Sequence, residues 1–151
     1  MRFESIHDVL EHARNMHQQV ADFYRQLDDA SAQTRVRMLL DYLAEHEQHL
    51  ADAMHELGSE ADPALLHSFL AHMPDPVQFD EALHTPIRPD MSVDEVLEIA
   101  LRFDDALIAL YQDLAEHTDN EAVRDLLNNL TELENLEKRR VARNTMMMQD
   151  I

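Results

Sequence analysis

Five side chains with metal-binding chemistry fall where a helical pattern calls for apolar residues. With successive residues about 100° apart around a helix, Glu47 lies inside the apolar stripe of its segment. Glu134 and Glu137 lie inside the stripe of another segment, and His17 and Asp104 take corresponding places on two more. Buried carboxylates repel one another and lose their hydration, and a divalent cation relieves both penalties. Because carboxylates with an imidazole suit iron and manganese, with zinc as a further option, the pattern predicts a metal centre.

Two further histidines could complete this centre. His46 and His49 form a His-x-x-His pattern, which presents both imidazoles to one side of a helix. The alternative is that both are half-buried surface histidines. Glu137 has a similar alternative, because it opens the charged run EKRR and could be solvated beyond the core.

Four helices are needed to bring these residues together. Apolar residues recur at helical spacing, and the predicted helices lie near residues 5–28, 32–57, 92–115 and 120–146. In an antiparallel pair, a turn centred near residue 32 places position 17 opposite position 47, and a turn near residue 119 does the same for 104 and 134. One layer of the bundle is therefore expected to hold His17, Glu47, Asp104 and Glu134, with Glu137 one turn away.

Several residues are candidates for the helix ends. Ser31 or Thr34 could cap the second helix, because a serine or threonine oxygen can accept a hydrogen bond from the first turn. Ser92 and Thr118 each stand three residues before a glutamate, as in a capping box. Gly58 stands where a C-terminal glycine would end the second helix.

The two helical pairs are copies of one another. A shift of 87 positions aligns residues 5–51 with 92–138 without a gap and yields 14 identities. Chance would give roughly three to four for a helix-biased composition, so an internal duplication is the better explanation. The chain is therefore predicted to be one all-α four-helix bundle, residues 1–151, with a hairpin at 5–57, a link at 58–91 and a hairpin at 92–147.

The link between the hairpins is long for a bundle loop. It contains all five prolines, and one short helix is expected near 64–72. A link of this length lets the chain travel the length of the bundle before the third helix begins, which is the one-crossover topology of ferritin-like folds. The alternative is an up-down-up-down bundle with a loose loop.

The hairpins resemble those of the rubrerythrin and bacterioferritin group within the ferritin-like superfamily. The segments HQQVADFYRQL and DDALIALYQDL carry the resemblance for the first helix of each hairpin, and LAEHEQHL and LTELENLE carry it for the second. In that family each first helix supplies a glutamate seven residues before the tyrosine, and each second helix supplies Glu-x-x-His. Together these residues bind two irons.

The resemblance to this metal-binding motif is partial. Seven residues before the two tyrosines stand His17 and Asp104. Glu47 and Glu134 match the two bridging carboxylates, whereas the first histidine position is occupied by Leu50 and the second by a further glutamate. The resemblance implies that the two matching glutamates bridge and that the altered positions supply terminal ligands where their side chains allow it.

Composition excludes several function classes. With 31 acidic and 12 basic residues the formal net charge is -19, which disfavours nucleic acid and anionic membranes as partners. The absence of cysteine excludes disulfides, thiolate nucleophiles and cysteine-ligated clusters. No apolar segment is long enough for a signal sequence or a membrane span, so we expect a cytoplasmic protein.

Two functions follow from these observations. The first is an iron- or manganese-binding ferritin-like protein that reduces dioxygen or peroxide. It would need an external reductant, because the electron-relay domain of rubrerythrins requires four cysteines. The second is a metal-free, degenerate bundle that serves as a homodimeric interaction module. Leu50, Leu133 and Leu136 favour it because they make one side of the site apolar, and Leu101 and Ile108 widen the apolar arc of the third helix, as a dimer surface would.

Overall fold

The computed structural model describes residues 5–70 and 88–149 of the chain, with side chains as far as residue 146. These residues form the helices α1 (Ile6–Ala30), α2 (Thr34–Glu60), α3 (Pro63–Leu66), α5 (Val93–Glu116) and α6 (Glu121–Gln149). Each of the four long helices begins and ends within three residues of its predicted bounds. The predicted all-α class is therefore confirmed.

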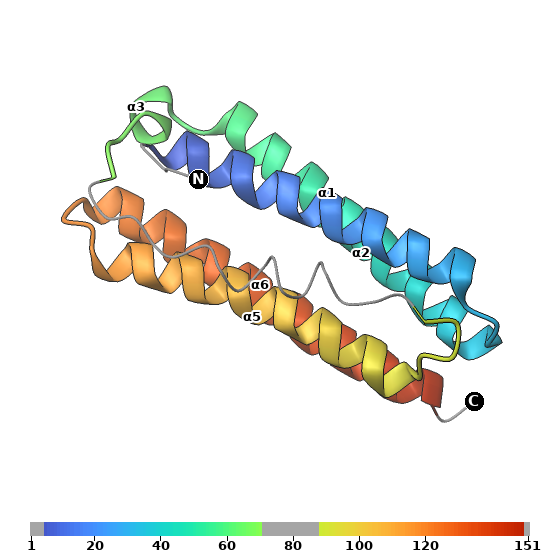
Figure 1. The fold of residues 1–151 in the computed structure, drawn as a ribbon. Coiled ribbons are helices and arrows are strands. Elements are labelled where there is room, and N and C mark those ends of the chain that lie inside the picture. Colours follow the sequence, from blue (N-terminus) through green and yellow to red (C-terminus); the bar gives the residue numbers. More distant parts are fainter. Residues whose placement is uncertain (1–4, 71–87, 150–151) are drawn as a thin grey trace.

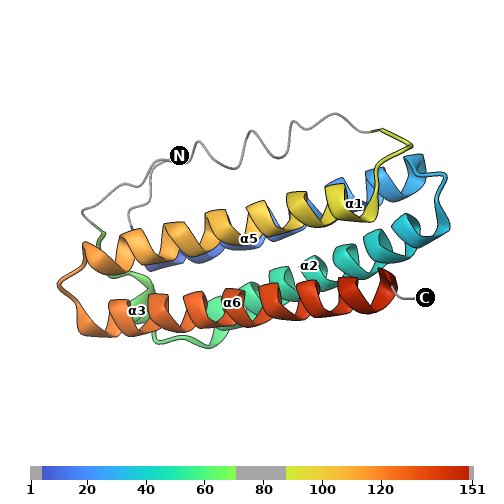
Figure 2. The same ribbon diagram turned by 90° about the horizontal axis from the view of Figure 1, so that it is seen from below.

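The two hairpins pack against each other along their length (Figure 1). The helix α2 ends beside the start of α1, whereas α5 begins at the opposite end of the bundle, beside the turn between α1 and α2 (Figures 1 and 2). At that turn the Ala32 amide donates to the Pro89 carbonyl at 3.4 Å. Helices α1 and α6 thus run one way and α2 and α5 the other, which confirms the crossover topology and excludes the up-down-up-down alternative.

An aromatic cluster fills the core close to the predicted metal layer. The Phe103 ring packs edge-on against Phe23 and Tyr24, with ring centroids 6.1 and 6.2 Å apart. Leu43 and Leu130, which occupy equivalent positions in the two repeats, are buried in the same core. Burial of a leucine side chain stabilises the fold by about 1.5–3 kcal/mol. These apolar contacts keep the helices in the rotation that turns the polar residues inward.

No helix in the described part of the chain combines the length and the apolar character needed to cross a membrane.

The ends of the helices confirm one boundary prediction and contradict others. Ser92 caps α5, because its Oγ accepts from the Glu95 amide at 3.1 Å. The helix α2 follows Gln33, whose side chain makes no capping bond, and it continues past Gly58. Asn120 caps α6 in place of Thr118, because its Oδ1 accepts from the Ala122 and Val123 amides.

The short helix in the link is also shorter than expected. Among the link residues that the structure describes, it is limited to α3, a single turn that follows Asp62 and starts with a proline at its first position. The predicted helix extended to residue 72, and positions 71 and 72 lie outside the described residues.

Candidate metal centre

His17 lies in the middle of the bundle and connects the two hairpins. Its Nδ1 is 2.5 Å from Glu47 Oε2 on α2, and its Nε2 is 2.9 Å from Glu134 Oε1 on α6. Carboxylate oxygens only accept hydrogen bonds, so both ring nitrogens must donate and the imidazole is held as a cation. All three side chains are almost completely buried.

The charge of the two glutamates controls the protonation of His17. Burial by itself lowers the pKa of a histidine, but the two neighbouring carboxylates outweigh it and raise the pKa of His17 to about 10. His17 therefore carries a positive charge at neutral pH.

Asp104 belongs to the same layer. It is 3% exposed, and it interacts electrostatically with Glu47, Glu134 and His17. Burial, together with the charge of the two glutamates, raises the pKa of Asp104 to about 9, although His17 opposes this shift. Asp104 is consequently protonated at neutral pH. The four residues that the sequence places in one layer thus come together in the structure.

Three polar atoms near this layer have no hydrogen-bond partner among the described residues. They are the hydroxyls of Tyr24 and Tyr111 and the Oε2 atom of Glu134, all fully buried. Burial, reinforced by nearby carboxylates, raises the pKa of both tyrosines well above the usual value, so both hydroxyls keep their protons. An unsatisfied buried polar group costs about 1–3 kcal/mol. Glu134 Oε2 in particular is an anionic oxygen that a cation would stabilise.

Glu137 lies one turn beyond Glu134 but is paired toward the outside of the bundle. Its Oε2 is 3.1 Å from His46 Nε2, a distance that permits an ion pair although the alignment is too poor for a hydrogen bond. Its Oε1 accepts from Arg140 at 3.3 Å. The His46 ring also stacks on Tyr42, with centroids 5.8 Å apart. Glu137 and His46 therefore form a second polar cluster between α2 and α6, next to the layer.

The remaining predicted residues do not join the layer. His49 is exposed on the outer surface of α2. Leu50 is 4% exposed and stands in the first repeat at the position equivalent to Glu137, as the sequence indicated. Leu133 is partly buried against the core, whereas Leu136 is 43% exposed. The expectation that Leu136 makes one side of the site apolar was wrong, because that residue faces away from the core.

Sequence reasoning missed the two tyrosine hydroxyls as members of the site. In the sequence, Tyr24 and Tyr111 serve only as reference positions for the motif, although they are identical in the two repeats. Both repeats have a tyrosine at this position, two helical turns after His17 and Asp104, and this spacing could have indicated that the hydroxyls lie beside the layer.

The layer contains donor atoms of the kind that bind a divalent cation, but it does not gather three of them within 4.8 Å of one another. In the structure the imidazole separates Glu47 from Glu134, so their oxygens do not meet at one point. The donor set nevertheless consists of carboxylate oxygens and one imidazole, which suits iron and manganese. The unpartnered oxygen of Glu134 lies among these donors. The residues therefore fit a metal ion chemically.

Another group of ligand-type side chains lies at the end of α5. Within the described residues, the ligand atoms of Asp113, Glu116 and His117 are all within 4.8 Å of one another. Glu116 and His117 are exposed, and Asp113 also accepts from the His117 ring through its backbone carbonyl at 2.8 Å. Exposed groups of this kind are ordinary features of an acidic surface, so the buried layer is the better candidate centre.

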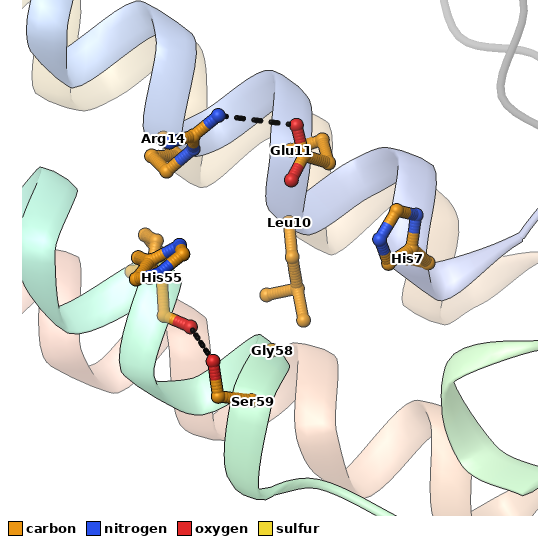
Figure 3. A pocket seen from close by; sticks show the side chains of 8 residues that line it. His7, Leu10, Glu11, Arg14, His55, Gly58 and Ser59 are labelled. Carbon is orange, nitrogen blue, oxygen red and sulfur yellow. Dashed lines mark hydrogen bonds and ion pairs between the residues drawn. The ribbon is translucent and has the colours of Figure 1, made fainter. Parts of the chain in front are cut away.

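A separate cavity of about 130 Å³ lies between the start of α1 and the end of α2 (Figure 3). His7, Glu11 and Arg14 line it from α1, and His55 and Ser59 line it from α2. Arg14 donates to Glu11 at 3.3 Å, and the Ser59 hydroxyl donates to the His55 carbonyl at 3.1 Å. No residue of the central layer lines this cavity, so the two features are independent.

Comparison with known proteins supports the architecture. Neither a family model nor a curated protein matches the sequence. A solved structure from Thermotoga maritima, provisionally described as a ferritin-like diiron-carboxylate protein, matches with a TM-score of 0.62 and 21% identity. The match covers 97% of this chain and 98% of that chain. The chain therefore has the ferritin-like fold expected from the sequence.

Proposed function

We propose that this ferritin-like bundle binds a divalent metal ion, iron or manganese, in the layer around His17. The observation that supports the proposal best is the Oε2 atom of Glu134, a buried anionic oxygen without a partner among the described residues. It lies in the same layer as Glu47 and Asp104, so hard oxygen donors from three helices are available. The Thermotoga maritima protein with the same fold, which is provisionally described as a ferritin-like diiron-carboxylate protein, supports the same class of ligand.

The residues of the layer have distinct roles in this proposal. Glu47 and Glu134 are the central carboxylates, and Asp104 and Glu137 are further oxygen donors. His17 could act as a ligand only if it gave up a proton and one of its hydrogen bonds to the two glutamates. Iron or manganese bound there would supply one-electron redox chemistry toward dioxygen or peroxide. Tyr24 and Tyr111 keep protonated hydroxyls beside the layer and can donate hydrogen bonds into it.

An oxidative activity needs an electron source outside the chain. Reduction of peroxide to two waters consumes two electrons and two protons. The sequence contains no cysteine, so no iron–sulfur relay can be built from thiolates of this chain. If the bound metal is redox-active, we therefore propose that it depends on a separate reductant.

Thermal unfolding with and without metal tests the proposal. Protein purified without a metal-chelating tag should contain iron or manganese by elemental analysis. Its melting temperature should fall in chelator at neutral pH and recover with Fe(II) under anaerobic conditions or with Mn(II), because a ligand of the folded state stabilises it. The matched pair is Glu134→Gln and Glu132→Gln: only the first, which alters a fully buried residue, should abolish the recovery. A melting temperature that ignores chelator and both metals would contradict the proposal.

The second candidate is a metal-free bundle that acts as a homodimeric interaction module. The specific observation in its favour is that the His17 cation already binds both Glu47 and Glu134, so the layer has a positive charge of its own. A dimer surface on α5 would have to rest on Leu101, because Ile108 is only 9% exposed within the single chain. Light scattering at micromolar concentration separates a dimer from a monomer.

A further inference from the structure

The two halves of the layer can be compared residue by residue, because the repeats align without a gap. The α1–α2 half contributes His17, Glu47 and Leu50, and the α5–α6 half contributes Asp104, Glu134 and Glu137 at the equivalent positions. One half therefore contains a single carboxylate, and the other contains three. A symmetric arrangement of two ions would need comparable donors on both sides.

In the α1–α2 half, the charge of Glu47 is already balanced by His17, and both nitrogens of His17 already have partners. Both nitrogens of His17 donate to carboxylates, at 2.5 Å to Glu47 and 2.9 Å to Glu134, so neither has a lone pair left for a metal. Leu50, where the other half has Glu137, is 4% exposed and offers no donor atom. A metal ion in this half would have to displace a buried ion pair and would find only Glu47 as a carboxylate ligand.

The α5–α6 half has donors that are not used. Glu134 binds His17 through Oε1, but its Oε2 is buried without a partner among the described residues. Asp104 is 3% exposed and interacts electrostatically with Glu134. Glu137 is 8% exposed and follows Glu134 by one helical turn, so it lies on the same side of α6, where its Oε2 is 3.1 Å from His46 Nε2.

We propose that the layer takes one divalent ion, held in the α5–α6 half by Asp104 and Glu134 Oε2, while His17 serves as the built-in cation of the α1–α2 half. Glu137 is the third carboxylate available to that ion. This inference rests on the proposed function, since it presupposes that the layer binds a metal. It differs from a dinuclear centre in the number of ions and in the role of His17, which acts as a counter-charge and not as a ligand.

Titration of the full-length, metal-depleted chain with Mn(II) tests the number of ions. Calorimetry should give one tight site per chain, abolished by Asp104→Asn and retained by the matched control Asp105→Asn, because Asp105 is an exposed neighbour paired with Lys138. Two sites per chain would overturn the inference while leaving the proposed function intact. No binding to the folded chain would instead contradict the proposed function, and this inference with it.

Pulsed electron paramagnetic resonance tests the role of His17. The Mn(II) bound in the layer should show the spectrum of an isolated ion, without exchange coupling to a second ion and without strong coupling to a histidine nitrogen. An exchange-coupled pair or a directly coordinated imidazole nitrogen would overturn the assignment.

A variant that copies one half onto the other tests the reason for the asymmetry. The double change His17→Asp and Leu50→Glu gives the α1–α2 half the residues of the α5–α6 half, so the number of Mn(II) ions should rise from one to two per chain. A folded double variant that still binds one ion would show that these two positions do not set the number. If the double variant fails to fold, the stoichiometry and the spectrum of the unmodified chain decide the question.

Discussion

Replacing Asp104 with asparagine tests whether the buried layer has to take up a proton when the metal is absent. Asparagine is close in size to the protonated carboxyl group and can also donate a hydrogen bond, but it does not titrate. In chelator, Asp104→Asn should therefore be more stable than the unmodified protein at neutral pH. Asp105→Asn, which changes an exposed neighbour of the same type, is the control.

The size of the effect follows from the pKa of Asp104. The ordinary pKa of 3.8 rises to about 9 in the folded protein, so between these values the folded state binds a proton that the unfolded state has released. Stability contributed by this group is therefore lost as the pH rises from 3.8 to 9. At about 1.4 kcal/mol per pH unit, the penalty that asparagine avoids reaches at most about 4 kcal/mol at pH 7.

The assay is denaturant unfolding of both variants and the unmodified protein at several pH values in chelator. The stability difference between Asp104→Asn and the unmodified protein should be near zero at pH 4 and grow by about 1.4 kcal/mol for each pH unit up to pH 8. Asp105→Asn should show no such growth. A difference that stays constant between pH 5 and pH 8 would refute the reasoning, because it would mean that Asp104 is ionised in the folded protein. Added Mn(II) should stabilise the unmodified protein and leave Asp104→Asn unchanged.

Three further changes test other parts of the layer and the fold. His17→Gln should lower the free energy of unfolding by about 3–5 kcal/mol at pH 7, because it leaves two buried carboxylates without their cation. This loss should shrink as the pH rises toward 10, where His17 of the unmodified protein loses its proton in the folded state. Urea unfolding at pH 7 and pH 10 checks both statements. Tyr111→Phe removes a buried hydroxyl that has no partner among the described residues, so the stability in chelator should be unchanged or should rise by up to about 1–3 kcal/mol. Thermal unfolding measures this change, and a clear loss of stability would show that the hydroxyl has a partner. Asn120→Ala should cost about 1 kcal/mol in the same assay, whereas Thr118→Ala should cost less, because Asn120 makes the capping bonds to α6.

Much of the fold could be predicted from the sequence, because its signals are local and repeated. Helical spacing of apolar residues set the four helices to within three residues, and the gap-free repeat paired them into hairpins. The helix ends were harder, since several capping residues compete within a few positions. Ser31 and Thr34 flank the start of α2, yet the chain enters that helix at Gln33 without a side-chain cap.

The composition of the layer could also be predicted, but its internal contacts could not. A helical position determines the direction of a Cα–Cβ bond, which is why His17, Glu47, Asp104 and Glu134 were expected together. Whether the imidazole binds a metal or lies between two glutamates depends on rotamers and on charges from three other helices. The same reason explains Glu137, which the sequence placed near the layer and the structure pairs with His46.

The sequence by itself therefore determined the helices, their pairing and the residues that face inward, because each follows from periodicity along one segment. The tertiary structure decided that both nitrogens of His17 are occupied, that Glu134 Oε2 is left unpartnered, and that Asp104 holds a proton at neutral pH. These properties arise from electrostatic interactions over a few ångströms in a buried layer where water is excluded. Side chains from residues 17 to 134 contribute to them, so no single segment of the sequence contains the information.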